Sequence, residues 1–271
     1  MTSTTLRLSE TGRAIGLREA GSGAPVVLIH GVGMQSAAWA PQIEALSLTH
    51  HVIALDMPGH GSSAPLPQGS QLPAYVAWLR EALTGITSAP VSLVGHSMGA
   101  LIAAGFAVSH PGQVARVALL NGVYRRSAEA RAAVRQRAAE IAAGHHDIDT
   151  PLKRWFGDTP AEQKARAAVA RWLRAVELEG YANAYTAFAT GDATYADRFA
   201  EISCPFLALT GAQDPNSTPR MAQAMAEAVQ DGQAVVIDGH RHMVNLTAPD
   251  VVTGHLNAWL SRTAKTREAL R

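Results

Sequence analysis

The sequence predicts an α/β protein with a mostly parallel, eight-stranded sheet that carries helices on both faces. Three short apolar runs support this prediction: VVLIH at 26–30, VIALD at 52–56 and VSLVG at 91–95. Such continuous runs are typical of strands that are buried on both faces, as in parallel sheets. Helical stretches at 37–47 and 72–83 separate the three runs, and this alternation is typical of parallel β-α-β units.

The remaining elements of the predicted sheet follow from similar patterns. A weak alternation of apolar and polar residues predicts two antiparallel N-terminal strands, at about 5–8 and 14–20, joined by a turn. Further strands are expected at 114–121, 205–211 and 233–238, a helix of small and apolar residues at 98–108, and a last helix at 249–261. The charged tail, residues 262–271, is expected to fray.

Residues 123–203 interrupt this alternation. They are rich in Ala and Arg, show helical periodicity at 127–143 and 161–180, and carry turn signals at 144–146 and 157–160. We therefore expect a core formed by residues 1–122 and 204–271 and a helical cap formed by residues 123–203. Five arginines and one acid fall within residues 123–137, which allows a basic face on the cap.

Length and composition exclude several classes of protein. The chain has 271 residues, 47% of them hydrophobic, and a formal net charge of +1. This charge gives no reason to expect nucleic acid or an anionic membrane as a partner. The one cysteine, Cys204, cannot form an internal disulfide, which fits a reducing compartment. Because we find neither a signal peptide nor a membrane span, we expect a cytoplasmic protein. We expect it to be a monomer or a homodimer.

The strongest motif is Gly-His-Ser-Met-Gly at 95–99, between a predicted strand and a predicted helix. A tight strand-to-helix turn lifts a serine hydroxyl from the end of a sheet, and flanking glycines avoid collisions across that turn. We assign Ser97 as the nucleophile, a chance glycine-rich loop being the alternative. A glycine turn at 30–33 follows another strand, so the backbone N–H groups of Val32 and Met98 are expected to form an oxyanion hole. An ordinary glycine turn is the alternative there.

A serine nucleophile needs a base, and a histidine base needs a carboxylate to orient it. Asp214 and His242 each follow a predicted strand, so both fall at the carboxyl edge of the sheet beside Ser97. We prefer His242 to His240, which would face the opposite way in an extended loop. We prefer Asp214 to Asp238, which would need a sharp fold-back to reach the imidazole.

With these motifs the chain resembles the α/β-hydrolase superfamily over nearly all of its length outside the insertion. The residues that carry the resemblance are His30–Gly33 with Trp39, Asp56–Ser63, Gly95–Gly99, Gly211–Asp214 and His242–Pro249. The resemblance implies an α/β-hydrolase fold with a helical cap after the sixth strand. Serine rather than aspartate at 97 argues against the haloalkane dehalogenase and epoxide hydrolase branches. Thr247 departs from the glutamate that relatives often carry, at a position that supports the loop.

Two cap fragments, Lys153-Arg154-Trp155-Phe156 and Glu179-Gly180-Tyr181-Ala182, resemble those of 3-oxoadipate enol-lactone hydrolases and related small-ester hydrolases. Trp155 and Phe156 could line the substrate pocket, and Arg154 or Arg125 could pair with a carboxylate of an anionic substrate. The alternative is that the two aromatic residues only pack the cap helices and the arginines are solvated.

We therefore expect a serine hydrolase that cleaves a small carboxylic ester, lactone or related acyl compound through an acyl-enzyme. No cofactor is expected, and no metal, because the histidine pairs lack carboxylates at metal-ligand spacing. Two alternatives remain open. One is a carbon–carbon bond hydrolase or an amidase that acts on a small catabolic acid. The other is a hydrolase-fold receptor that binds a small ligand without turnover.

Overall fold

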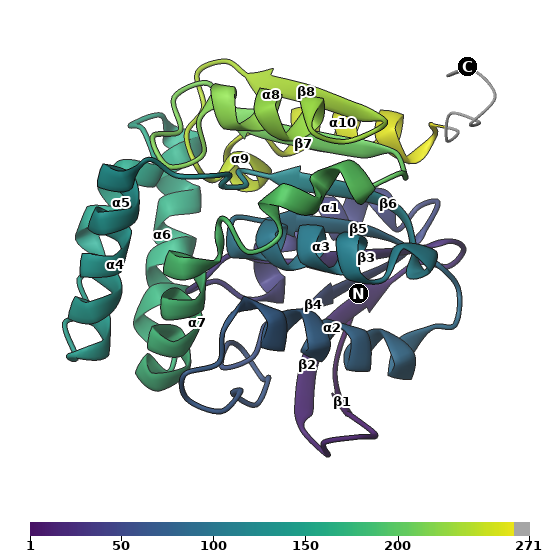
Figure 1. Ribbon diagram of the computed structural model, residues 1–271, viewed down its shortest axis with the longest axis horizontal. Coiled ribbons are helices and arrows are strands. Elements are labelled where there is room, and N and C mark those ends of the chain that lie inside the picture. Colours follow the sequence, from purple (N-terminus) through teal and green to yellow (C-terminus); the bar gives the residue numbers. More distant parts are fainter. Residues whose placement is uncertain (263–271) are drawn as a thin grey trace.

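The computed structural model describes residues 1–262, and the expected fraying of the charged tail concerns mainly residues 263–271, outside the described part (Figure 1). Eight strands form one sheet in the order β1-β2-β4-β3-β5-β6-β7-β8. The strands are β1 (Thr2–Arg7), β2 (Ala14–Ala20), β3 (Pro25–Ile29), β4 (His51–Leu55), β5 (Val91–His96), β6 (Val114–Leu120), β7 (Phe206–Gly211) and β8 (Gly232–Ile237). Strands β1 and β2 are antiparallel and the others run parallel, which confirms the predicted sheet.

Alternate residues of the central strands supply two hydrophobic cores, one on each face of the sheet. In β3, Val27 and Ile29 face one core, while Val26 and Leu28 face the other. The first core is covered by α2 (Leu72–Ile86), α3 (Met98–Ser109) and α8 (Pro219–Glu227), and the second by α1 (Ala40–Leu46) and α10 (Pro249–Leu260). Burial on both faces explains why these strands read as continuous apolar runs.

Short helices complete the structure around the sheet. They are η1 (Ser36–Trp39), η2 (Pro111–Gln113), η3 (Ala196–Glu201) and α9 (Val244–Thr247). The expected helix at 37–47 is thus a 3-10 turn followed by α1, and the helix α8 was not expected from the sequence. Among the described residues, none of the helices combines the length and the hydropathy that crossing a bilayer requires.

The segment between β6 and β7 is helical. It contains α4 (Ala128–Ala142), α5 (Asp149–Trp155), α6 (Pro160–Ala175) and α7 (Leu178–Gly191), which gather at one side of the molecule (Figure 1). The turn signal at 157–160 marks the start of α6, where Thr159 and Glu162 form a capping box. The helix α5 was not expected from the sequence, because its seven residues are too few to show a clear helical periodicity.

The helical periodicity at 161–180 corresponds to two helices. Helix α6 ends at Ala175, and Val176 and Glu177 are extended before α7 begins. The break brings Gly180 against Gly59, whose φ is +74°. A Cβ atom on Gly180 would lie 2.6 Å from the carbonyl oxygen of Gly59. This close approach of two backbones limits where α7 can start. The apolar pattern of the sequence does not indicate such a contact.

The contact between Gly180 and Gly59 makes a stability prediction. Replacing Gly180 by Ala improves helix propensity by up to about 1 kcal/mol. We nevertheless expect Gly180→Ala to lower the free energy of unfolding by about 1–3 kcal/mol, because the methyl group meets backbone atoms that cannot move aside. Urea denaturation measures this change.

The matched control is Gly254→Ala in α10. Gly254 is exposed, and a Cβ atom there meets nothing within 4 Å. This substitution is expected to stabilise the protein by roughly 0.4–1 kcal/mol. If both variants are equally stabilised, the contact does not constrain α7.

Candidate active site

Ser97 lies at the turn between β5 and α3, where the backbone must reverse within one residue. Its φ of 55° and ψ of −113° fall in a region that side chains rarely adopt. A Cβ atom on Gly95 would lie 2.1 Å from the carbonyl oxygen of Gly99, and one on Gly99 would lie 2.2 Å from that of Ile29. Both glycines are therefore required by the packing of the turn. The N–H of Ser97 donates to the carbonyl of Leu120 at 2.9 Å, which ties the turn to β6.

His242 and Asp214 form a buried pair at the carboxyl ends of β8 and β7. The Nδ1 atom of His242 lies 2.7 Å from Oδ2 of Asp214, and each residue is 3% exposed. Because a carboxylate only accepts hydrogen bonds, Nδ1–H is the donor and Nε2 keeps a free lone pair. His240 instead contacts Thr247 at 2.9 Å, and Asp238 is exposed.

Further hydrogen bonds hold the carboxylate of Asp214 in its charged form. Asn121 Nδ2 donates to Oδ2 at 2.8 Å, and the N–H of Asn216 donates to Oδ1 at 2.8 Å. Burial alone would raise the pKa of Asp214, but the charge and hydrogen bond of His242 and these two donors outweigh it. The pKa of Asp214 is therefore lower than its ordinary value, and the group is ionised at neutral pH.

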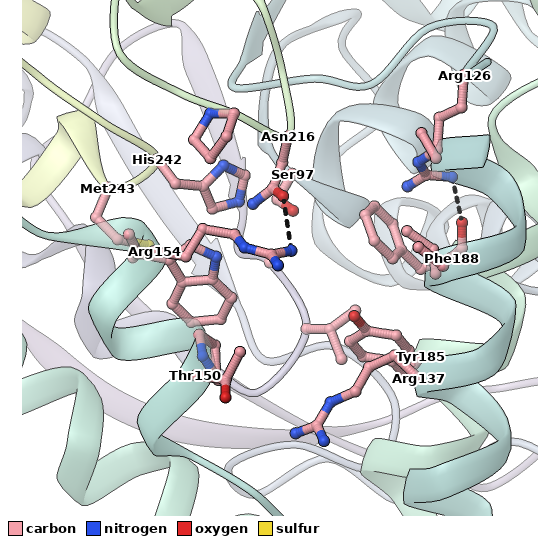
Figure 2. A pocket seen from close by; sticks show the side chains of 18 of the residues that line it. Ser97, Arg126, Arg137, Thr150, Arg154, Tyr185, Phe188, Asn216, His242 and Met243 are labelled. Carbon is pink, nitrogen blue, oxygen red and sulfur yellow. Dashed lines mark hydrogen bonds between the residues drawn. The ribbon is translucent and has the colours of Figure 1, made fainter.

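Ser97 and His242 face the same cavity (Figure 2). Within residues 1–262, the Ser97 hydroxyl has no hydrogen-bond partner, so its contact with the imidazole is not formed in this structure. Hydrogen bonds used for proton transfer are often long in ligand-free proteins and tighten when a substrate binds. The arrangement thus brings a hydroxyl, an imidazole and a carboxylate to one edge of the sheet.

Two backbone N–H groups beside Ser97 are available as donors. Val32 lines the cavity and Met98 is the first residue of α3, and neither N–H donates a hydrogen bond within the described chain. The loop that carries Val32 is held by His60, whose Nε2 accepts the N–H of Gly33 at 2.9 Å. Burial lowers the pKa of His60 to about 3, so the imidazole stays neutral and remains an acceptor.

His96 and Trp155 position the loop and ring of His242. The Nε2–H of His96 donates to the carbonyl oxygen of His242 at 2.9 Å, and burial lowers the pKa of His96 to about 3. The Trp155 ring lies over the imidazole of His242, with centroids 5.5 Å apart and an interplanar angle of 31°. The sheet and the helical segment between β6 and β7 therefore both contact the same histidine.

The cavity beside Ser97 has a volume of about 440 Å³ and is lined by cationic and aromatic side chains. Arg154 and Trp155 line it as expected, but the structure does not bring Phe156 and Arg125 there. Phe156 is buried in the core, and Arg125 forms a surface ion pair with Asp197 at 2.6 Å.

Arg126, Arg137 and Tyr185 are among the further cavity residues that escaped the sequence prediction. The arginine-rich stretch 123–137 contains the first two and was the available signal, although it could not say which arginines point inward. Three arginines line the cavity, and among the described residues no Asp or Glu does.

The described chain contains no group of three or more His, Cys, Asp or Glu residues placed to hold a metal ion.

Comparisons with known proteins fit this arrangement. Residues 26–254 match the model of the Alpha/beta hydrolase family. Over 263 residues, 97% of this chain and all of its relative, the chain is 51% identical to (E)-2-((N-methylformamido)methylene)succinate hydrolase from Acinetobacter baylyi.

Solved structures share the fold. A malate-bound thermophilic esterase from Thermogutta terrifontis superposes with a TM-score of 0.86 at 25% identity, over 96% of this chain and 98% of its own. The enol-lactonase from Burkholderia xenovorans has a TM-score of 0.84 at 24% identity, over 96% of this chain and all of its own. The fold likeness that the sequence suggested to enol-lactone hydrolases is thus confirmed.

The hydrogen bond from Asn121 makes a prediction about pH. Asn121→Gly removes the donor to Asp214 without straining the backbone, since Asn121 has φ of 47°. We expect kcat/KM to fall by about 10-fold or more, because a hydrogen bond to a charged group contributes ~1.5–3 kcal/mol. The pKa of Asp214 should rise, so activity should be lost at a higher pH than in the unaltered enzyme as the pH is lowered. A pH–rate profile measures both effects.

Arg125→Gly is the control for Asn121→Gly. Arg125 also has φ of 47°, lies in the same loop and is directed to the surface. Activity close to that of the unaltered protein is expected. Equal losses in the two variants would show that the loop, and not the hydrogen bond to Asp214, matters.

Proposed function

Because the chain belongs to the alpha/beta hydrolase family, we propose that it hydrolyses an N-acyl enamine that carries two carboxylates. Its relatives are hydrolases, so the chain is an enzyme, and this favours catalysis over the receptor alternative. The observation that carries the substrate proposal is the cavity beside Ser97, which is lined by three arginines and by no acidic residue of the described chain.

The substrate named for the Acinetobacter relative matches this cavity in charge and in chemistry. The name describes a succinate, hence two carboxylates, joined through a C=C bond to the nitrogen of an N-methylformamide. An arginine binds a carboxylate through charge and paired hydrogen bonds. The formamide carbonyl is an acyl group that a serine can attack. Identity of 51% over nearly the whole of both chains supports carrying this substrate class over.

The three arginines differ in how closely carboxylates of the protein already pair with their charge. Arg126 is buried and paired with Asp192 at 3.2 Å. Arg137 lies near Glu140 and Asp147, with contacts of 3.6 and 3.9 Å.

Among the described residues, Arg154 makes only a 3.4 Å hydrogen bond to Asn216, and it is exposed. Figure 2 shows its guanidinium on the cavity side of the labelled Ser97 and His242, with the dashed line to Asn216. A cation that no described carboxylate pairs with favours an anionic substrate at this place.

The first half of the proposed reaction forms an acyl-enzyme. Ser97 Oγ attacks the formyl carbonyl while Nε2 of His242 takes the hydroxyl proton. The oxygen of the tetrahedral intermediate becomes negative and accepts hydrogen bonds from the N–H groups of Val32 and Met98. The imidazolium, which is stabilised by Asp214 at 2.7 Å, then protonates the nitrogen as the C–N bond breaks and the enamine leaves.

The second half of the reaction regenerates the serine. A water molecule attacks the formyl ester of Ser97, and His242 takes a proton from this water. As the second tetrahedral intermediate collapses, the ester bond breaks, His242 returns the proton to Ser97 Oγ, and formate is released. The same residues act in both halves, so a single geometry at the edge of the sheet is sufficient.

A carboxylic ester is the second candidate for the scissile bond. The ester or lactone expected from the sequence stays a prediction, and the malate-bound esterase supports it. The malate bound to that esterase is also a dicarboxylate. The carbon–carbon alternative has no observation of this kind in its favour.

The nucleophile and the substrate charge are tested together. We expect turnover of (E)-2-((N-methylformamido)methylene)succinate, and Ser97→Ala should lower kcat by about 10⁴- to 10⁶-fold. The dimethyl ester of the same compound keeps the formamide but lacks both charges. It should react with a lower kcat/KM, measured by formate release. Release of formate by Ser97→Ala at the normal rate would refute the acyl-enzyme.

The role of Arg154 is tested with the same pair of compounds. Arg154→Gln should raise KM for the diacid by about 10-fold, because a charge-assisted hydrogen bond is lost. The diester should be affected much less. Arg171 is exposed on α6 and does not line the cavity, so Arg171→Gln is the matched control and should behave as the unaltered enzyme. An equal change of KM for both compounds would exclude charge recognition by Arg154.

A further inference from the structure

We propose that Tyr185 is a specificity-determining residue, whose phenol O–H donates a hydrogen bond to a carboxylate of the substrate. The proposal rests on the dicarboxylate class of substrate put forward above and adds a residue that selects for it. It assigns a role to α7, whose start the sequence did not indicate.

The ring of Tyr185 is fixed by its neighbours on α7. Tyr181 and Phe188 lie one turn before and one turn after it, and both rings contact it edge-on with centroids 5.8 Å away. Tyr181 is itself buried, at 2% exposed. A ring held on two sides keeps its hydroxyl in one place, so little conformational entropy is lost when the hydroxyl binds a ligand.

The hydroxyl of Tyr185 opens on the cavity that contains Ser97. The ring is partly buried and lines this cavity, and among residues 1–262 its hydroxyl makes no hydrogen bond. Figure 2 shows the hydroxyl directed into the cavity. A fixed hydroxyl in this place can exchange water for a hydrogen bond to a ligand.

The surroundings determine which kind of partner fits. Burial raises the pKa of Tyr185, and Arg137, Arg126 and Arg154 each oppose this rise, so all three cations act on the phenol oxygen. The group stays protonated at neutral pH and can donate. The arginines are donors only, so a ligand group rich in lone pairs is the kind of partner that fits among them. A carboxylate has two oxygens with about four acceptor positions, enough for an arginine and the phenol together.

A neutral donor adds a further fixed contact to the charge-assisted hydrogen bonds of the arginines. The long-range attraction of the arginines acts on any anion that enters the cavity, whatever the spacing of its carboxylates. A hydrogen bond from a fixed hydroxyl weakens steeply when the angle departs from linear. Tyr185 therefore selects a carboxylate at one distance from the acyl carbon, and distinguishes the correct diacid from other anions that the arginines attract.

The test compares Tyr185→Phe with Tyr124→Phe. Tyr124 also has a buried ring, but its hydroxyl donates to the carbonyl of Ala196 at 3.3 Å and does not line the cavity. We expect Tyr185→Phe to raise KM for the diacid by about 10- to 100-fold, the factor that a hydrogen bond to a charged group supplies. Since this bond does not involve the reacting atoms, kcat should change by less than about 3-fold. Tyr124→Phe should leave both constants unchanged.

The ratio of kcat/KM for the diacid over its dimethyl ester gives the second reading. It should fall in Tyr185→Phe, whereas damage to packing would lower both values together. An unchanged ratio, or a loss confined to kcat, would overturn the proposal.

Binding of succinate, measured by calorimetry, tests Tyr185 independently of turnover. Its Kd should be at least about 10-fold weaker in Tyr185→Phe than in the unaltered enzyme. Failure of the enzyme to hydrolyse the diacid, together with a Kd that depends on Tyr185, would refute the proposed function and leave this inference standing. A Kd that is equal in both proteins, or no binding to either, would refute the inference itself.

Discussion

The conformation of one residue, Ser97, constrains the centre of this structure. A residue other than glycine at φ of 55° and ψ of −113° costs about 1–3 kcal/mol, so the surrounding structure must impose this backbone conformation. They do so through backbone contacts that only glycines at 95 and 99 allow. The strand before Ser97 is buried on both faces, and the helix after it is apolar all round. The rigid sheet thus holds a strained turn in place, and the N–H of Met98 is left free by the same geometry.

Buried neutral histidines transmit this rigidity to the loops around Ser97. His30 donates from Nδ1 to the carbonyl of Gly31 at 2.8 Å and accepts the N–H of Met57 at 2.9 Å. His60 links the loop after β4 to the loop after β3 in the same way. An imidazole does this only while neutral, with one donor and one acceptor nitrogen. Burial disfavours the charged form and lowers the pKa of both residues, so the loops keep their hydrogen bonds at mildly acidic pH.

The sheet and the residues at its edge could be predicted because their signals are local. Apolar runs mark the strands, and the residue that follows a parallel strand falls at the carboxyl edge whatever the loops do. The cap could not be predicted in the same detail. Arg125 and Arg126 are adjacent, yet Arg125 pairs with Asp197 at the surface and Arg126 is buried against Asp192. A positive φ at Arg125 separates their directions, and nothing in the sequence marks it.

Two parts of the chain therefore carry different physical tasks. The proposed proton transfer depends on Ser97, Asp214 and His242, whose positions follow from the register of β5, β7 and β8. The cavity cations lie in the segment between β6 and β7, on α4 and α5 and in the loop before them. Substitutions there can change the charge presented to a substrate without moving a strand. Arg126 shows the limit of this freedom, because a buried cation needs the carboxylate of Asp192, and losing either partner would leave an uncompensated buried charge. Within residues 1–262 Arg154 forms no ion pair, only a 3.4 Å hydrogen bond to Asn216, so this cavity cation is the one that is easiest to exchange.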